Sequence, residues 1–253
     1  GLVLLFSSHT GEPLAIFPDG VLQRMRVGAA SALGVKYLAR SDATSVGLIG
    51  AGWQAGAQVM ALAATRAVEV IRCYSPTPEK REAFCVEMTQ ATGIDMRPVA
   101  SAEEAVRDAG IVLCATNANE HVFLEQWLAP GMHVGSIRGA ELEPGVVQRA
   151  DMIAIHDRTA RAAITATRGV IMPKLRHAIE GIDDLTSAAP TLGELAAGMV
   201  QGRTSSQQTS CFLNLTGIGL QFAAAGAALY RKARAAGRGR ELPTEWFTED
   251  VVP

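Results

Sequence analysis

The sequence predicts an α/β protein with a doubly wound parallel sheet in its middle. Three observations predict this fold. Short apolar runs alternate with helical patterns between residues 46 and 156. A glycine-rich turn joins the first of these runs to a helix. Outside this stretch, the pattern consists of a hairpin and a helix before it and helices after it. Apolar strands separated by helices are typical of a parallel sheet covered on both faces.

The first forty residues predict a hairpin and then a helix. Strand patterns at 2–6 and 14–17 flank a turn rich in Ser, Thr, Gly and Pro. Apolar side chains then recur at helical spacing over residues 21–40. Because the chain opens directly in a strand pattern, we expect that the N-terminal part of this region lies upstream of residue 1.

The middle of the chain alternates between strands and helices. We expect strands at residues 46–49, 69–74, 96–99, 111–115, 133–137 and 152–156. We expect helices at residues 54–66, 78–92 and 102–108, the last of them capped by Ser101. Beyond residue 158 we expect only helices, at 192–200 and 216–236, and then a loop at 241–253.

Composition excludes several classes of function. Of 253 residues 48% are hydrophobic, and the formal charge is −2, which argues against a nucleic-acid or polybasic membrane surface. No apolar run approaches the roughly 18 residues of a membrane span. The four cysteines are scattered without metal-ligand spacing. We therefore predict a cytoplasmic protein without a metal site or a disulfide framework.

A dinucleotide-binding fingerprint follows the first apolar run of the middle region. The pattern G-x-G-x-x-A is typical of a turn that carries a pyrophosphate on the N-terminus of the next helix. The alternative is a glycine-rich turn in an unrelated α/β domain. The pattern nominates six cofactor-binding residues: Gly50, Ala51, Gly52, Trp53, Gln54 and Ala55.

The end of the second predicted strand bears on the choice between NAD and NADP. A carboxylate about 20 residues beyond the fingerprint would bind the ribose 2′-hydroxyl and repel a 2′-phosphate. Ser75 stands there instead, followed by Thr77, Lys80 and Arg81. These side chains favour NADP slightly and leave NAD open. The alternative is that Lys80 and Arg81 are ordinary solvated helix residues.

Further motifs carry a family resemblance along almost the whole chain. They are Met25-Arg26…Lys36-Tyr-Leu-Ala-Arg40, the Gly50 turn, Cys114-Ala-Thr-Asn117, Leu128-Ala-Pro-Gly131, Glu141-Leu-Glu-Pro…Asp151, Leu192-Gly-Glu-Leu…Gly202-Arg-Thr204 and Asn214-Leu-Thr-Gly217. In this order they resemble the ornithine cyclodeaminase/μ-crystallin family.

The resemblance implies a domain organisation and a reaction class. It implies a Rossmann-like domain at residues 43–159, inserted into a substrate and dimerisation domain made from residues 1–42 and 160–253. It implies hydride exchange between a nicotinamide and the α-carbon of a small amino acid or cyclic imino acid, as in a deaminating lyase, an imine reductase or an amino-acid dehydrogenase. It also implies a homodimer. The alternative is a non-catalytic, NADP-dependent binding protein of the μ-crystallin type.

The resemblance also nominates site residues. Arg26 matches the carboxylate-binding arginine, with Arg24 as the fallback, and Gly28 is assigned to the substrate site beside it. Four more residues are assigned to the cofactor: Ala115, Thr116, Asn117 and Thr216.

Three departures from the family pattern concern catalysis. His156, with Asp157 next to it, stands where the family has a catalytic aspartate, and either could carry a proton. Phe222 stands where the last helix often has an aspartate. The family's catalytic lysine and a second carboxylate-binding arginine would lie upstream of residue 1. These departures favour the binding-protein alternative, whereas Arg26 and the glycine turn allow both.

Overall fold

The computed structural model describes residues 1–158, 186–215 and 217–247. The chain forms two compact units, one made of Gly1–Arg26 with Ile218–Pro253 and the other of Val27–Gly217. Helix α1 (Asp19–Leu38) begins in the first unit and ends in the second.

The first unit is a hairpin that packs against a helix. Strand β1 (Leu2–Phe6) pairs antiparallel with β2 (Pro13–Pro18), as the sequence predicts. Helix α10 (Gly219–Ala235) packs on β1. A Cβ atom at Gly226 of α10 would lie 3.5 Å from Phe17 and 3.9 Å from Leu5. A short 3-10 helix, η2 (Thr244–Phe247), follows.

The other face of the hairpin is apolar and uncovered. Leu2, Leu4 and Phe6 alternate along β1, so they project from one face, and Ile16 pairs directly with Leu4. Their exposed fractions are 69%, 53%, 53% and 44% in that order. An exposed apolar patch of this kind is typical of an interaction surface.

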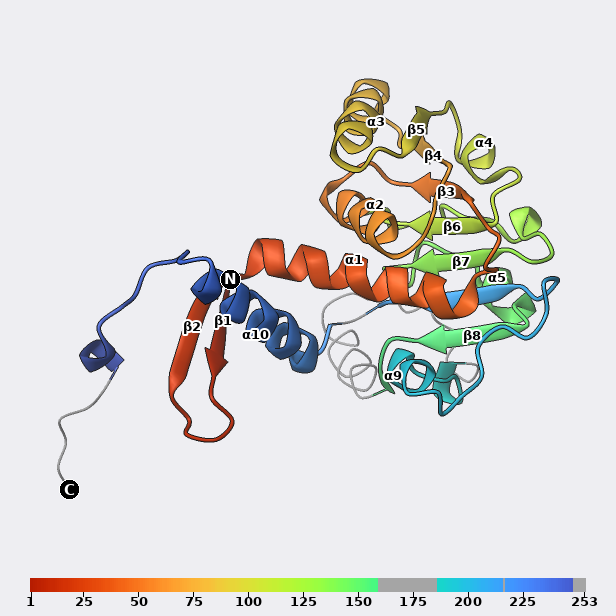
Figure 1. The fold of residues 1–253 in the computed structure, drawn as a ribbon. Coiled ribbons are helices and arrows are strands. Elements are labelled where there is room, and N and C mark those ends of the chain that lie inside the picture. The colour runs from red at the N-terminus through yellow and green to blue at the C-terminus, as the bar shows by residue number, and fades with distance from the viewer. Residues whose placement is uncertain (159–185, 216, 248–253) are drawn as a thin grey trace. The chain divides into compact units, whose positions relative to one another are not determined.

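The second unit is built on one parallel sheet of seven strands. Its strands are β3 (Ser45–Ile49), β4 (Val70–Tyr74), β5 (Asp95–Pro98), β6 (Ile111–Cys114), β7 (His133–Ser136), β8 (Met152–Ile155) and β9 (Ser210–Leu213). Their order is β5-β4-β3-β6-β7-β9-β8 (Figure 1). The order reverses between β3 and β6, which confirms the doubly wound sheet and defines its switch point.

Helices cover both faces of this sheet. One face packs against α1, α2 (Trp53–Thr65) and α3 (Pro78–Thr92), and the opposite face packs against α4 (Ala102–Val106) and α5 (Pro144–Arg149). The pleat of β6 shows the division, because Ile111 and Leu113 belong to the first core and Val112 and Cys114 to the second. Two short elements complete the unit: η1 (Glu125–Trp127) and α9 (Leu192–Ala196).

The sheet differs from the sequence prediction in one strand. β9 lies beyond residue 158, where only helices were expected, and it inserts between β7 and β8. It was missed because it begins with a polar residue, Ser210, and directly follows a polar loop. The predicted boundary at residue 160 therefore does not enclose the whole sheet, and the compact unit runs on to Gly217.

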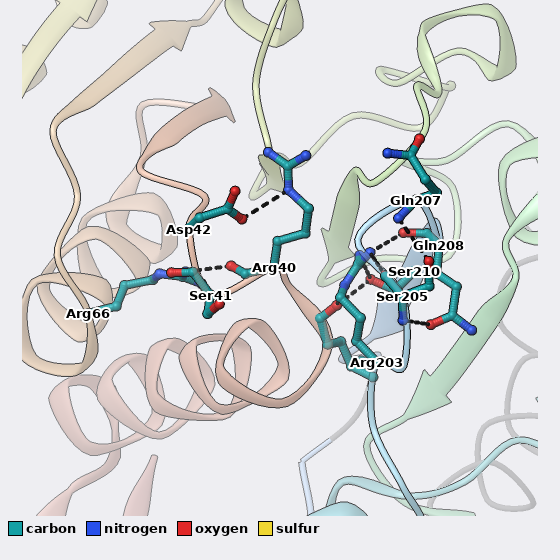
Figure 2. A network of polar contacts seen from close by, with 10 residues as sticks. Arg40, Ser41, Asp42, Arg66, Arg203, Ser205, Gln207, Gln208 and Ser210 are labelled. Carbon is teal, nitrogen blue, oxygen red and sulfur yellow. Dashed lines mark hydrogen bonds and ion pairs between the residues drawn. The ribbon is translucent and has the colours of Figure 1, made fainter.

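A network of polar contacts lies at the amino-terminal ends of the sheet strands, called here the amino edge of the sheet (Figure 2). Arg203 donates through Nε to the Leu38 carbonyl oxygen at 2.7 Å and through Nη2 to Ser210 Oγ at 3.1 Å. Arg66 donates to the Arg40 carbonyl oxygen at 2.7 Å. Arginine donors thus meet backbone acceptors where α1 ends and β9 begins.

Candidate functional site

The turn between β3 and α2 requires a glycine at its first position. Gly50 has a φ of +117°, a conformation that L side chains rarely adopt. A Cβ atom there would collide with the Ala115 carbonyl oxygen. The Gly50 N–H donates to the Tyr74 carbonyl oxygen at 2.7 Å, so the turn is held against the ends of β4 and β6.

The second glycine leaves the start of α2 open. Gly52 is the N-cap of α2, and no side chain caps the helix there. A Cβ atom on Gly52 would have no atom within 4 Å. No acidic residue lies in the first turn, so its N–H groups and the helix dipole favour an anion. Ala55, the third small residue, is fully buried against the sheet.

The other fingerprint residues surround this opening. Ala51 is half-buried and packs against the first core, and Trp53 is 48% exposed. The buried side-chain oxygen of Gln54 has no donor among the described residues. An acceptor of this kind suits a nucleotide hydroxyl. The residues present therefore fit a bound dinucleotide.

An arginine of α3 contacts the residues at the end of β4. Arg81 Nη1 donates to the Ser75 carbonyl oxygen at 2.7 Å, and its Cζ lies 5.7 Å from the centre of the Tyr74 ring. Lys80 is exposed, and Thr77 is the N-cap of α3 without a capping bond from its side chain. The structure thus brings Arg81 to the strand end more closely than the sequence indicated.

A buried carboxylate lies at the ends of β6 and β7. Glu141 is fully buried, and its Oε1 accepts hydrogen bonds from the backbone N–H and the hydroxyl of Thr116, at 2.6 and 2.9 Å. Its Oε2 accepts from Ser136 Oγ, Ile137 N and Arg138 N at 2.8, 3.0 and 3.0 Å. Sequence reasoning quoted Glu141 within a motif but gave it no role.

The predicted residues after β6 adjoin the glycine turn. Ala115 N–H donates to the Ile49 carbonyl oxygen at 2.8 Å, and Thr116 follows it. Asn117 is the next residue on the same loop. Because β3 and β6 are neighbours at the switch point, Ala115 and Thr116 lie beside Gly50, whereas the cofactor role of Asn117 stays a prediction.

The predicted catalytic pair lies elsewhere on this edge. His156 and Asp157 follow β8, and β9 and β7 separate that strand from β6. His156 is buried, and its backbone N–H donates to the Leu213 carbonyl oxygen at 3.1 Å. Both residues take part in further interactions within the structure. Thr216 lies outside the described residues.

The predicted substrate residues differ in their surroundings. Arg26 Nη1 donates to Gln221 Oε1 at 3.2 Å, and its Cζ lies 5.0 Å from the centre of the Phe222 ring. Burial lowers the pKa of Arg26, and the charge of Asp19 offsets this in part. Gly28 lies where α1 crosses α2, and a Cβ atom there would collide with the Ala57 carbonyl oxygen. Close helix packing therefore accounts for Gly28, and its assignment to the substrate remains a prediction.

The described residues contain neither a candidate metal site nor a candidate membrane span. No three His, Cys, Asp or Glu side chains in these ranges gather in a way that could hold a metal ion. None of the helices in the same ranges is long and apolar enough to cross a membrane.

Comparison with known proteins decides the family. Residues 1–237 match the profile of the Ornithine cyclodeaminase/mu-crystallin family. The chain belongs to this family. A curated member, the Delta(1)-pyrroline-2-carboxylate reductase of Bacillus cereus (strain ZK / E33L), is 31% identical over 96% of this chain and 74% of its own length.

Solved structures of family members agree. The Delta(1)-pyrroline-2-carboxylate reductase of Thermococcus litoralis, in complex with NADH and L-proline, is 29% identical with a TM-score of 0.81 and covers 95% of this chain and 74% of its own. The iminosuccinate reductase of Paracoccus denitrificans, in complex with NAD+, is 26% identical with a TM-score of 0.79 and covers 96% and 73%. The sequence resemblance and the predicted fold class of this family member are thereby confirmed.

Proposed function

We propose that this chain is an NAD(P)H-dependent imine reductase that acts on a small cyclic imino acid of the Delta(1)-pyrroline-2-carboxylate type. Related members carry the names of imine reductases, an alanine dehydrogenase and an ornithine cyclodeaminase. The open glycine turn on α2 supports a dinucleotide at that place. A bound NAD(P)H supplies the hydride for the imine carbon.

The surroundings of Arg26 carry the proposal. The guanidinium contacts an amide oxygen and a ring face, both uncharged, and no carboxylate of the described residues lies within ion-pair distance of it. Ring stacking occupies the face of a guanidinium and leaves its in-plane N–H donors for a planar anion. We assign Arg26 to the substrate carboxylate, which it would bind through two of these donors.

The imine nitrogen needs a proton when the carbon receives the hydride. His156 and Asp157 remain our candidates for holding that proton, since imidazole and carboxyl groups both exchange protons in catalysis. A lyase reaction is the alternative on a diamino acid: its α-carbon would give up a hydride to NAD(P)+ and form an imine, and the side-chain amine would attack that imine. Ammonia would leave, and the hydride would return to the cyclic imino acid, so that the cofactor is recycled.

One observation favours the alternative that the protein binds its ligands without turnover. The family resemblance assigns His156, with Asp157 as the alternative, to the position of the catalytic aspartate, and His156 is buried. Turnover separates the two functions. A binding protein would hold NADPH and the imino acid without oxidising the cofactor.

Arg81 supports the slight preference for NADP. Its guanidinium is anchored at Ser75, where a carboxylate would otherwise select the 2′-hydroxyl. The Arg81→Gln variant should raise the Kd for NADPH roughly tenfold and leave the Kd for NADH unchanged, because a hydrogen bond to a charged group is lost. Lys80→Gln is the matched control, and an equal effect of both variants on NADPH would contradict the assignment.

The proposal includes a homodimer in the cytoplasm. The uncovered apolar face of the hairpin supports a second copy as its partner. One related structure, an archaeal alanine dehydrogenase, is described as a dimer. The four cysteines are free thiols, which suits a reducing compartment.

Oxidation of NADPH and NADH with Delta(1)-pyrroline-2-carboxylate tests the function directly. We expect turnover, and we expect Arg26→Met to raise the KM for the imino acid at least about 30-fold, the effect of removing one partner of a hydrogen-bonded charge pair. Arg24→Met is the matched control. Ammonia release from L-ornithine would indicate the lyase instead, and saturable binding without turnover would indicate a binding protein.

A further inference from the structure

Glu141 is a buried acidic residue in the loop after β7, close to the proposed dinucleotide site. It is fully buried, and the described residues offer it no ion pair. Five uncharged donors hold it instead, two from Thr116 and one each from Ser136, Ile137 and Arg138. A buried charge is costly unless hydrogen bonds compensate it fully, so this arrangement ties its donors firmly in place.

The donors come from two different loops. Thr116 follows β6, whereas Ser136 ends β7 and the other two donors follow it. The backbone of Glu141 extends the connection, because its carbonyl oxygen accepts from Val122 N and Phe123 N at 2.8 and 3.0 Å. One residue therefore joins the loops at the ends of two adjacent strands.

A continuous series of contacts leads from Glu141 to the glycine turn. Thr116 donates to the carboxylate, and Ala115 precedes it. Ala115 N–H bonds to Ile49, and its carbonyl oxygen occupies the space that a side chain on Gly50 would need. The Glu141 carboxylate is thus connected to the Gly50 turn through Thr116 and Ala115.

Two groups of backbone N–H donors lie at the carboxyl ends of the strands, one at Ile137 and Arg138 and one at the start of α2, and only the first binds a carboxylate of the chain. Ile137 and Arg138 present successive N–H groups, an arrangement that binds anions, and Glu141 already fills it. The first turn of α2 has no such internal anion among the described residues. The internal carboxylate therefore leaves α2 as the place for a phosphate.

We infer that Glu141 is a positioning residue of the cofactor site: it holds the loops after β6 and β7 in the shape that receives the nicotinamide half of the dinucleotide. The inference rests on the proposed nicotinamide cofactor. The adenine half belongs to the other side of the switch point, at the end of β4, which no hydrogen bond to Glu141 reaches.

Calorimetric titration of two ligands tests this inference. Glu141→Gln keeps the size of the side chain but replaces one acceptor oxygen by an amino group, so one of the two loops loses its partner. We expect the Kd for the preferred NAD(P)H to rise on the order of tenfold, the effect of losing hydrogen bonds to a charged group. The Kd for AMP, or for adenosine 2′,5′-bisphosphate if NADPH is preferred, should change less than about threefold, because this ligand consists of the adenine half alone.

Two further variants keep the test decisive. Glu143→Gln is the matched control, because Glu143 accepts a backbone hydrogen bond from Glu125 at 2.7 Å outside the cluster, and it should change neither Kd. Ser136→Ala removes a single donor and should show the same split at smaller size if Glu141→Gln does not fold. Equal weakening of both ligands, or no change in either, would overturn the inference. Failure of the wild-type protein to bind any dinucleotide would overturn the proposed function itself.

Discussion

The two edges of the parallel sheet are both rich in polar groups, but they use them differently. At the amino edge, Arg203 and Arg66 donate to carbonyl oxygens of the chain, and Ser210 joins the network (Figure 2). At the carboxyl edge, the first turn of α2 has no side-chain cap, and Gly52 faces open space. Polar groups with internal partners stabilise the fold, whereas open donors of fixed geometry are suited to a ligand.

The largest expected effect is that of Gly50→Ala, which should differ from that of Gly52→Ala in the same turn. Gly50→Ala should cost about 3 kcal/mol of the free energy of unfolding, because it combines left-handed strain with a collision at Ala115, and it should abolish NAD(P)H binding. Gly52→Ala should fold normally, since φ is −104°, and raise the Kd for NAD(P)H about tenfold, or ~1.4 kcal/mol. Urea unfolding and fluorescence titration measure both. A stable Gly50→Ala variant with normal NAD(P)H binding would contradict the claim that this turn requires a glycine at its first position.

A variant at the amino edge should show the opposite pattern. Arg203→Met removes donors from Leu38 and Ser210 and should lower the free energy of unfolding by about 3 kcal/mol. The Kd for NAD(P)H should stay within about twofold of the wild-type value, because no open donor is involved. Arg97→Met is the control, since that ion pair with Asp95 is exposed and should matter by less than about 0.5 kcal/mol. A large rise in Kd for Arg203→Met would place this edge in the binding site.

The amino edge should also make stability depend on pH. Burial, with the charges of Arg203 and Arg66, lowers the pKa of His133 to about 3 from a usual 6.5. Because the unfolded chain binds the proton first, stability is lost as the pH falls from 6.5 toward 3, by up to ~1.4 kcal/mol per pH unit. Urea unfolding at several pH values should show this slope, and His133→Asn should flatten it. An unchanged slope in His133→Asn would show that another group is responsible.

The smallest effect concerns Glu194 at the start of α9. Its ion pair with Arg158, 2.8 Å long, and its hydrogen bonds to Thr191 lower its pKa to about 2. The stabilisation is present above pH 4.5 and is lost as the pH falls toward 2. Glu194→Gln, made in the His133→Asn background, should reduce the remaining acid sensitivity in this window. Hydrogen bonds from Thr209 also lower the pKa of Asp151, so part of the acid sensitivity should remain. Thermal unfolding curves with the same acid sensitivity before and after Glu194→Gln would contradict the assignment.

The sequence was most informative where one residue type or one pattern has a single structural meaning. The hairpin and six of the seven sheet strands follow from apolar runs and turn residues, and Gly50 from the need for a positive φ. β9 was missed because its run begins with a polar residue, Ser210, and directly follows a polar loop. The role of Glu141 was missed because three of its five donors are backbone N–H groups, which any residue type offers, and because Thr116 lies on another loop. The contact of Arg26 with Gln221 joins residues 195 apart, a pairing that no local pattern reveals.

Titration of the wild-type protein and of Gly52→Ala with NADPH and NADH is the most direct test of the account. We expect saturable quenching of protein fluorescence by at least one of the two, and clearly weaker binding to a Gly52→Ala variant whose stability is unchanged. A wild-type protein that binds neither nucleotide, or a variant that binds as tightly as the wild type, would contradict the claim that the Gly50–Gly52 turn holds the cofactor.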